Sequence, residues 1–154
     1  MHGHHQTHST HSSDNASQLS LAHGATWHCL MGCGLGEVTG VIIGTALGLP
    51  NVNTLILAVV LGFVFGFIFG MQPLLRAGFD LTRALRQVFI AETLSIVVME
   101  ATEVLVQVYT PGVMEAGLGS WTFWAGMSLA LTAGYIAAFP VNYVLVGKGV
   151  RHVH

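Results

Sequence analysis

The chain has 154 residues, of which 53% are hydrophobic and only 8% are charged. Soluble domains carry roughly 25% charged residues, so this composition excludes an ordinary soluble domain. The formal net charge is −2 and there is no basic patch, so nucleic acid is not expected as a partner. The two cysteines lie four residues apart and do not indicate a disulfide framework.

Residues 1–26 are polar and rich in histidine. We expect them to form a disordered tail, because this composition cannot bury a hydrophobic core. Imidazole is a common ligand of transition metals, so a flexible histidine tract is suited to collecting metal ions. The expected metal-collecting residues are His2, His4, His5, His8 and His11. Because other residues separate these histidines, a natural tail is favoured over a purification tag.

Four apolar segments follow the tail, and each has about the 20 residues that a helix needs to cross a bilayer. They span residues 28–48, 53–72, 86–109 and 121–146. The predicted fold is an all-α membrane protein, a bundle of four transmembrane helices over residues 27–147. Between the second and third segments, Pro73 is expected to end a helix, and a short amphipathic connector should follow it. A short tail with basic residues and histidines, residues 148–154, follows the bundle.

The basic residues predict the orientation of this bundle. All five fall in two places, between the second and third segments and after the fourth: Arg76, Arg83, Arg86, Lys148 and Arg151. With four spans, both places lie on the same side of the membrane as the N-terminal tail. The positive-inside rule then predicts a multi-pass protein of the inner membrane with both termini in the cytoplasm.

Glycine recurs at every fourth position of the first segment, at Gly32, Gly36, Gly40, Gly44 and Gly48. A four-residue step drifts by only about 40° around an α-helix, so these glycines form a slowly winding stripe. The second segment has its own series, Gly62, Gly66 and Gly70. Small residues at this spacing let helix backbones approach closely in a membrane. We therefore expect glycine-zipper packing between the first two helices.

Chemically reactive residues form a second stripe beside the glycines, at Cys29, Cys33 and Glu37. The third segment carries a polar arc of roughly 140°, made of Glu92, Ser95, Met99, Glu100, Glu103 and Gln107. An ionised carboxylate at the centre of a membrane costs about 2.5–3.5 kcal/mol by insertion scales. Because the bundle interior has no Lys or Arg to pair with, bound metal, transported cations or protons, or protonation of the carboxyl groups must compensate.

Asn142 of the fourth segment is expected at the same depth in the membrane as the two cysteines. We therefore expect these residues to form one site. The predicted metal ligands are His28, Cys29, Cys33, Glu37, Glu92, Met99, Glu100, Glu103 and Asn142. His28 reaches this site only if the first helix begins after it. Thiolate and thioether ligands favour Cu(I) or Zn, whereas carboxylates favour harder ions. Copper or zinc is therefore the expected metal.

Three stretches carry a resemblance to a known family: residues 27–37 (from Trp27 to Glu37), residues 95–100 and residues 138–142. They resemble the prokaryotic membrane proteins grouped as domain-of-unknown-function family 4396. The resemblance implies a small polytopic membrane protein, often with His-rich ends, and it implies no activity.

The sequence therefore favours a membrane protein that binds or transports a transition-metal cation. The alternatives are a membrane redox metalloenzyme or haem protein with a glutamate proton path, a proton-coupled carrier of a small solute, and a purely structural glycine-zipper oligomer. No catalytic residue is assigned, and a metal-handling protein is favoured over an enzyme. The lipid bilayer and a metal ion are the expected partners, and a homo-oligomer is expected because four short spans make a narrow bundle.

Overall fold

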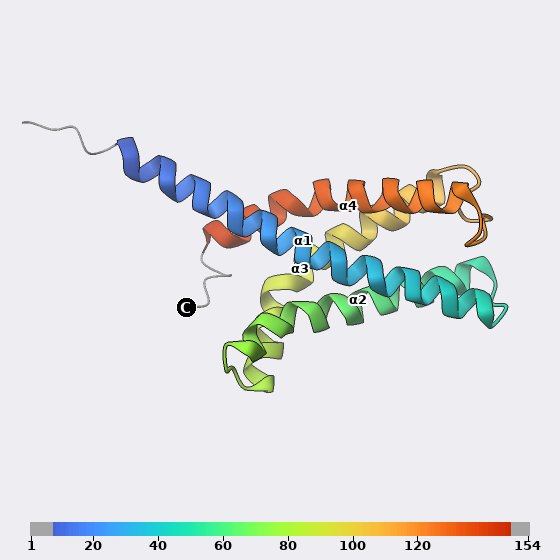
Figure 1. The fold of residues 1–154 in the computed structure, drawn as a ribbon, viewed down its shortest axis with the longest axis horizontal. Helices are drawn as coiled ribbons and strands as arrows, with labels where there is room; N and C mark the ends of the chain where they lie inside the picture. The colour runs from blue at the N-terminus through green and yellow to red at the C-terminus, as the bar shows by residue number, and fades with distance from the viewer. Residues whose placement is uncertain (1–7, 149–154) are drawn as a thin grey trace, which may run out of the picture.

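The computed structural model describes residues 8–148, which form four α-helices and no strand (Figure 1). The helices are α1 (His8–Ala46), α2 (Asn51–Arg76), α3 (Leu81–Tyr109) and α4 (Trp121–Gly147). The all-helical prediction is confirmed. Three of the four predicted apolar segments lie within one helix each, whereas the first, 28–48, extends two residues past the end of α1 at Ala46.

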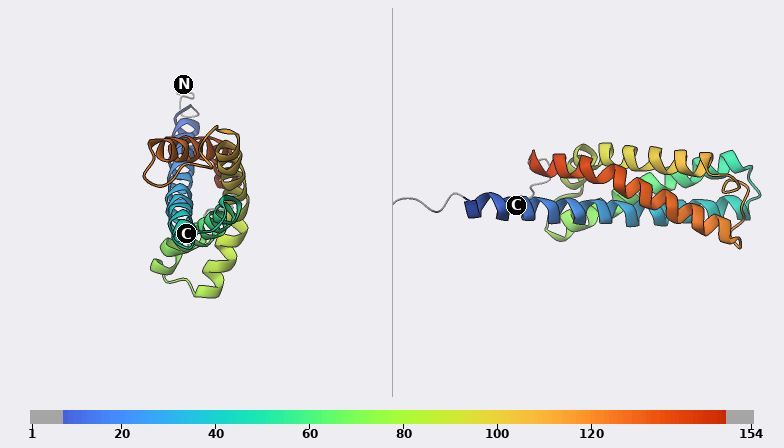
Figure 2. Two further views of the ribbon diagram at one scale, coloured as in Figure 1. Left: turned by 90° about the vertical axis from the view of Figure 1, so that its right-hand side faces the viewer. Right: turned by 90° about the horizontal axis from the view of Figure 1, so that it is seen from above.

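The four helices form an elongated bundle with two distinct ends (Figure 1). One end, here called the loop end, holds the connections 47–50 and 110–120. The other, here called the terminal end, holds the start of α1, the end of α4 and the turn 77–80. Seen end-on, the helices follow one another around a ring (Figure 2). Each packs on its neighbours in the chain, and α1 also packs on α4 and, over a shorter stretch, on α3, whereas the backbones of α2 and α4 do not approach closely within residues 8–148.

Three of the four helices are long and apolar enough to cross a membrane, over Asn15–Ala46, Asn51–Gln72 and Trp121–Gly147. The sequence predicted a fourth span in α3. That helix has 29 residues and is long enough to cross a membrane, but its glutamates interrupt the apolar sequence. Its outward side is nevertheless apolar, with Ile90 61% exposed, Leu94 56% exposed and Val97 45% exposed.

The N-terminal helix starts much earlier than predicted. The disordered tail was expected to reach residue 26, but α1 is already helical from His8. Contacts with α4 explain part of this extension, since Gln18 donates a hydrogen bond from Nε2 to the carbonyl of Tyr143 at 3.0 Å. His2, His4 and His5 lie outside the described residues.

The turn between α2 and α3 also differs from the prediction. α2 continues past Pro73 to Arg76. A proline removes one backbone donor, but the residues after it can still bond to the preceding turn, so the helix ends one turn later. Gly78 then adopts a positive φ of 85°. Asp80 caps α3 by accepting a hydrogen bond from the Thr82 amide at 3.2 Å. No separate amphipathic connector remains.

Glycines of α1 lie directly against the backbone of α2. A Cβ on Gly32 would lie 2.9 Å from the Cα of Gly66, and one on Gly36 would overlap the carbonyl oxygen of Leu61. A Cβ on Gly40 would lie 2.7 Å from the backbone nitrogen of Ala58. Only residues without a side chain permit this approach. The reactive stripe of α1 is thereby turned toward α3 and α4.

Candidate functional site

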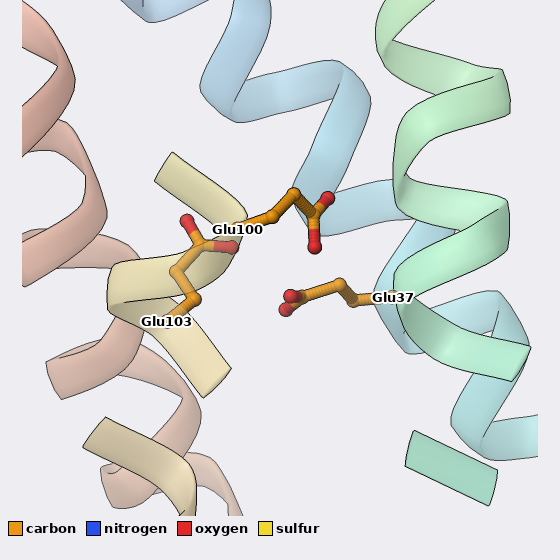
Figure 3. A group of neighbouring side chains, drawn as sticks. All are labelled: Glu37, Glu100 and Glu103. Atoms are coloured by element: carbon orange, nitrogen blue, oxygen red, sulfur yellow. The ribbon is translucent and has the colours of Figure 1, made fainter. Parts of the chain in front are cut away.

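Three glutamates meet in the interior of the bundle. Glu37 extends from α1 toward Glu100 and Glu103 of α3, and a carboxylate oxygen from each lies within 4.8 Å of the others (Figure 3). Their side chains are buried, with exposed fractions of 1%, 2% and 0% in the same order. Within residues 8–148, neither oxygen of any of the three has a hydrogen-bond partner. We call this group the carboxylate cluster.

Helix geometry and neighbouring glycines explain how the cluster forms. Glu100 and Glu103 are three residues apart, a spacing that puts both on one face of α3. A Cβ on Gly62 of α2 would overlap Oε1 of Glu100, and a Cβ on Gly134 of α4 would overlap Oε1 of Glu103. The two glutamates of α3 therefore rest against the bare backbones of the two flanking helices.

No basic side chain of the described residues enters the interior. Arg76, Arg83, Arg86 and Lys148 are all exposed, and they lie at the end of α2, in the first turns of α3 and directly after α4. Like charges at this separation disfavour one another, and burial disfavours each charge separately. Among the described residues, the three carboxyl groups therefore have no basic side chain beside them to offset their charge.

The two thiols lie next to the cluster, toward the terminal end. The sulfur atoms of Cys29 and Cys33 are 4.0 Å apart. Both are buried in one packed group with Ile96, Met99 and Ala138, which we call the sulfur layer. Cys33 precedes Glu37 by one helical turn, and Met99 directly precedes Glu100. Cys33 is therefore about 6 Å from Glu37 along the helix axis, and the sulfur layer directly adjoins the carboxylate cluster at Met99.

Asn142 lies beyond the sulfur layer. Its Nδ2 donates a hydrogen bond to the Thr26 hydroxyl at 2.8 Å, and Thr26 donates in turn to the carbonyl of Ala22 at 2.8 Å. Asn142 is fully buried, and its Oδ1 has no partner within the described part of the chain. The hydroxyl of Ser95 is also buried, and it too has no hydrogen-bond partner within residues 8–148. Asn142 thus belongs to a polar layer separate from the carboxylates.

Besides Asn142, two further predicted ligands lie outside both the carboxylate cluster and the sulfur layer. His28 is exposed, and its ring stands edge-on to Phe69 of α2 at 6.2 Å. α1 begins long before His28, which keeps this residue helical and directs it away from the carboxylate cluster. Glu92 is half-buried and lies against Gly70 of α2, outside the carboxylate cluster. His8 and His11 fall in the first turns of α1, and their side chains lie outside the described part.

Sequence reasoning did not single out Gly134 and Thr26. For Gly134 a signal was present, because small residues recur at every fourth position of α4, at Ala130, Gly134 and Ala138. All three are buried. This series marks the face of α4 that receives the side chains of α3.

Together these features define an all-helical protein of membrane-like composition with an acidic interior. The chain belongs to the family described as domain of unknown function (DUF4396), whose model matches residues 20–151. The matched region contains the whole carboxylate cluster and the sulfur layer, and the family resemblance of the sequence motifs is thereby confirmed. Comparison with curated proteins and with solved structures gave no match.

Proposed function

We propose that the protein is an integral membrane protein that binds a divalent transition-metal cation between Glu37, Glu100 and Glu103. The observation that carries this proposal is the convergence of three buried, unpartnered carboxylates within 4.8 Å of one another. Three negative charges at this distance repel one another, and removing them from water adds a further cost. A divalent cation offsets both effects, because it attracts all three carboxylates and supplies the missing ligand bonds.

The exposed apolar surface supports insertion into a membrane. Each helix exposes large aliphatic side chains, as Ile42 of α1, Ile56 of α2, Ile90 of α3 and Ile136 of α4 illustrate, with exposed fractions of 50%, 57%, 61% and 66%. Soluble monomers rarely expose contiguous apolar surface on every side. We therefore take α3 as the fourth span, with its glutamates directed inward and its apolar face directed toward lipid.

The positive-inside rule orients this bundle in the inner membrane. Arg76, Arg83 and Lys148 lie at or near the terminal end, whereas the connections 47–50 and 110–120 contain no Lys or Arg. The terminal end is therefore assigned to the cytoplasm. The histidine-rich N-terminal segment lies on the same side, where it is suited to collecting metal ions.

Ligand chemistry favours zinc over copper at the carboxylate cluster. Carboxylate oxygens suit divalent ions, whereas Cu(I) prefers thiolate and thioether ligands. Zinc accepts both oxygen and sulfur, so it is compatible with the cluster and with the neighbouring sulfur layer. All three carboxylates come from one chain, so binding does not require a second copy. A homo-oligomer remains a separate prediction.

Equilibrium metal binding tests the proposal. The purified protein in detergent is loaded with Zn²⁺, passed through gel filtration and analysed for metal content. We expect about one zinc ion per chain beyond any held by the histidine-rich segment, and an affinity of that site at least about tenfold lower in each of Glu37→Gln, Glu100→Gln and Glu103→Gln. Glu92→Gln is the matched control, because it removes a glutamate of α3 that lies outside the cluster. Absence of bound zinc in the wild type, or equal loss in the control, would contradict the proposal.

The same cluster favours a second function, a proton-coupled carrier of a small solute. Protonation also removes the charge of a buried carboxylate, so Glu100 and Glu103 could hold protons in place of a metal. Transport that survives chelation of all divalent ions but fails in Glu103→Gln would favour this function over metal binding.

A further inference from the structure

A pocket of about 290 Å³ lies at the loop end of the bundle. Side chains of all four helices and of the connection 110–120 line it. Val41 of α1 and Gln107 of α3 belong to this lining. Val41 follows Glu37 by four residues, and Gln107 follows Glu103 by four residues. Each therefore lies one helical turn, about 6 Å, from a member of the carboxylate cluster.

The lining suits a hydrated cation. Glu115 is the one ionisable residue among the lining residues, and Gln107, Asn51 and Thr54 add polar groups. A water molecule occupies about 30 Å³ of liquid, so the pocket has room for an ion with several waters. A pocket with acidic charge and no basic residue attracts cations and raises their local concentration.

The opposite side of the cluster is closed by apolar packing. Ile96, Met99 and Ala138 are each 0% exposed and pack around the two cysteines. An ion coming from the terminal end would have to cross this layer. Toward the loop end, by contrast, one turn of α1 and α3 separates the carboxylates from the pocket. Gln107, which is 8% exposed, lies in that turn.

We propose that the loop-end pocket is the entrance through which a hydrated divalent cation reaches the carboxylate cluster, with Glu115 attracting the ion and Gln107 contacting it on the way inward. This inference rests on the proposed function and adds the side of access. Under the orientation assigned above, the cation enters from the face of the membrane opposite to the termini.

Two glycines of the connection 110–120 allow a sharp test. This connection is held in place, since Val113 packs against Gly126 and the Trp124 Nε1 donates to the carbonyl of Leu118 at 2.8 Å. Gly117 lines the pocket, whereas Gly119 is not among the lining residues. A Cβ at either glycine would meet no atom within 4 Å. The backbone therefore has room for a Cβ at both positions, but only a side chain at position 117 would border the pocket.

The experiment measures rates of zinc exchange with purified protein in detergent. Association is followed by stopped flow, and release is followed by capture of Zn²⁺ with an excess of a fluorescent chelator. For Gly117→Trp we expect both rates to fall about tenfold or more, with unchanged occupancy at equilibrium, because a blocked entrance affects entry and exit alike. Gly119→Trp should exchange zinc at the wild-type rate.

A second variant tests the charge of the pocket independently of its size. Glu115→Gln should slow association about threefold at low ionic strength, and the difference should disappear at high salt. The inference is overturned if zinc binds at equilibrium but neither Gly117→Trp nor Glu115→Gln changes the exchange rates. If Gly117→Trp loses equilibrium binding, the substitution has distorted the site. The association rate of Glu115→Gln at low ionic strength then decides whether the pocket is the entrance. Absence of zinc in the wild type overturns the proposed function, and the inference falls with it.

Discussion

The carboxylate of Glu103 rests against the backbone of α4 at Gly134. A Cβ at Gly134 would overlap Oε1 of Glu103 and would lie 2.8 Å from its Cγ and 2.9 Å from its Cδ. Glu100 has the same relationship with Gly62 of α2. Small residues in this bundle therefore have two roles, since some bring helices together and others make room for buried acids.

Replacement of Gly134 by alanine should displace Glu103 from the cluster. Overpacking a buried position costs about 1–3 kcal/mol, which exceeds the helix-propensity gain of about 1 kcal/mol from glycine to alanine. We expect lower stability and weaker zinc binding, measured by thermal unfolding and equilibrium titration. Gly24→Ala is the control, because a Cβ there meets nothing within 4 Å. It should leave binding intact, and a Gly134→Ala protein with wild-type affinity would argue against this role of the glycine.

Zinc should stabilise the protein through the carboxylate cluster. A ligand that binds only the folded state adds about 2.7 kcal/mol of stability at a concentration of about 100 times its Kd. We expect the melting temperature to rise with added Zn²⁺ in the wild type and to stay constant in Glu103→Gln. Cys29→Ser should keep the response, since Cys29 lies in the sulfur layer. A response retained in Glu103→Gln would place the ion elsewhere.

Gly36→Ala should separate α1 from α2. The new Cβ would overlap the carbonyl oxygen of Leu61 and would lie 2.6 Å from the Cα of Gly62. Backbone atoms cannot rotate away as a side chain does, so the helices must move apart, at a cost of about 1–3 kcal/mol. Gly34→Ala is a suitable control two residues away, because its Cβ would meet only the Leu131 side chain, at 3.2 Å. Equal stability of the two variants in thermal unfolding would contradict the expectation.

Thr26→Val should destabilise the polar layer around Asn142. The substitution keeps the shape of the side chain but removes the acceptor of the Asn142 amide, which is fully buried. Hydrogen bonds between helices in membranes contribute about 0.6 kcal/mol on average and up to about 1.7 kcal/mol. We expect a loss in this range by chemical unfolding. Thr132→Val removes a similar bond within one helix at an exposed position and should change stability less.

Fusion reporters should reveal opposite locations for the two ends of the bundle. A fluorescent protein fused after residue 154 should fluoresce, because the positive-inside rule assigns that end to the cytoplasm. Alkaline phosphatase inserted at Gly119, in the connection without Lys or Arg, should be active on the other face of the membrane. Activity of the phosphatase at the C-terminus would reverse the assigned orientation.

Several features of the fold follow from local sequence patterns. Runs of apolar residues predict four helices, and the structure contains them. The polar arc of α3 is likewise local, since helical periodicity alone decides which residues share a face. Ser95, Met99, Glu100, Glu103 and Gln107 are indeed buried together. The charges alone showed that interior acids would lack basic partners, because the few basic residues lie outside the apolar segments.

Only the tertiary structure decided which glutamates meet. Glu92 shares the polar arc with Glu100 and Glu103, yet it lies outside the cluster because Glu37 of α1 meets α3 at the level of Glu100 and Glu103, about two helical turns from Glu92. The rotation and depth of α1 relative to α3 depend on the close contact between α1 and α2, which joins residues distant in sequence. Part of the extension of α1, at its contact with α4, and the pocket at the loop end likewise come from packing between helices. Periodicity specifies the face of a single helix, but the distance between two faces depends on every neighbour that packs against them.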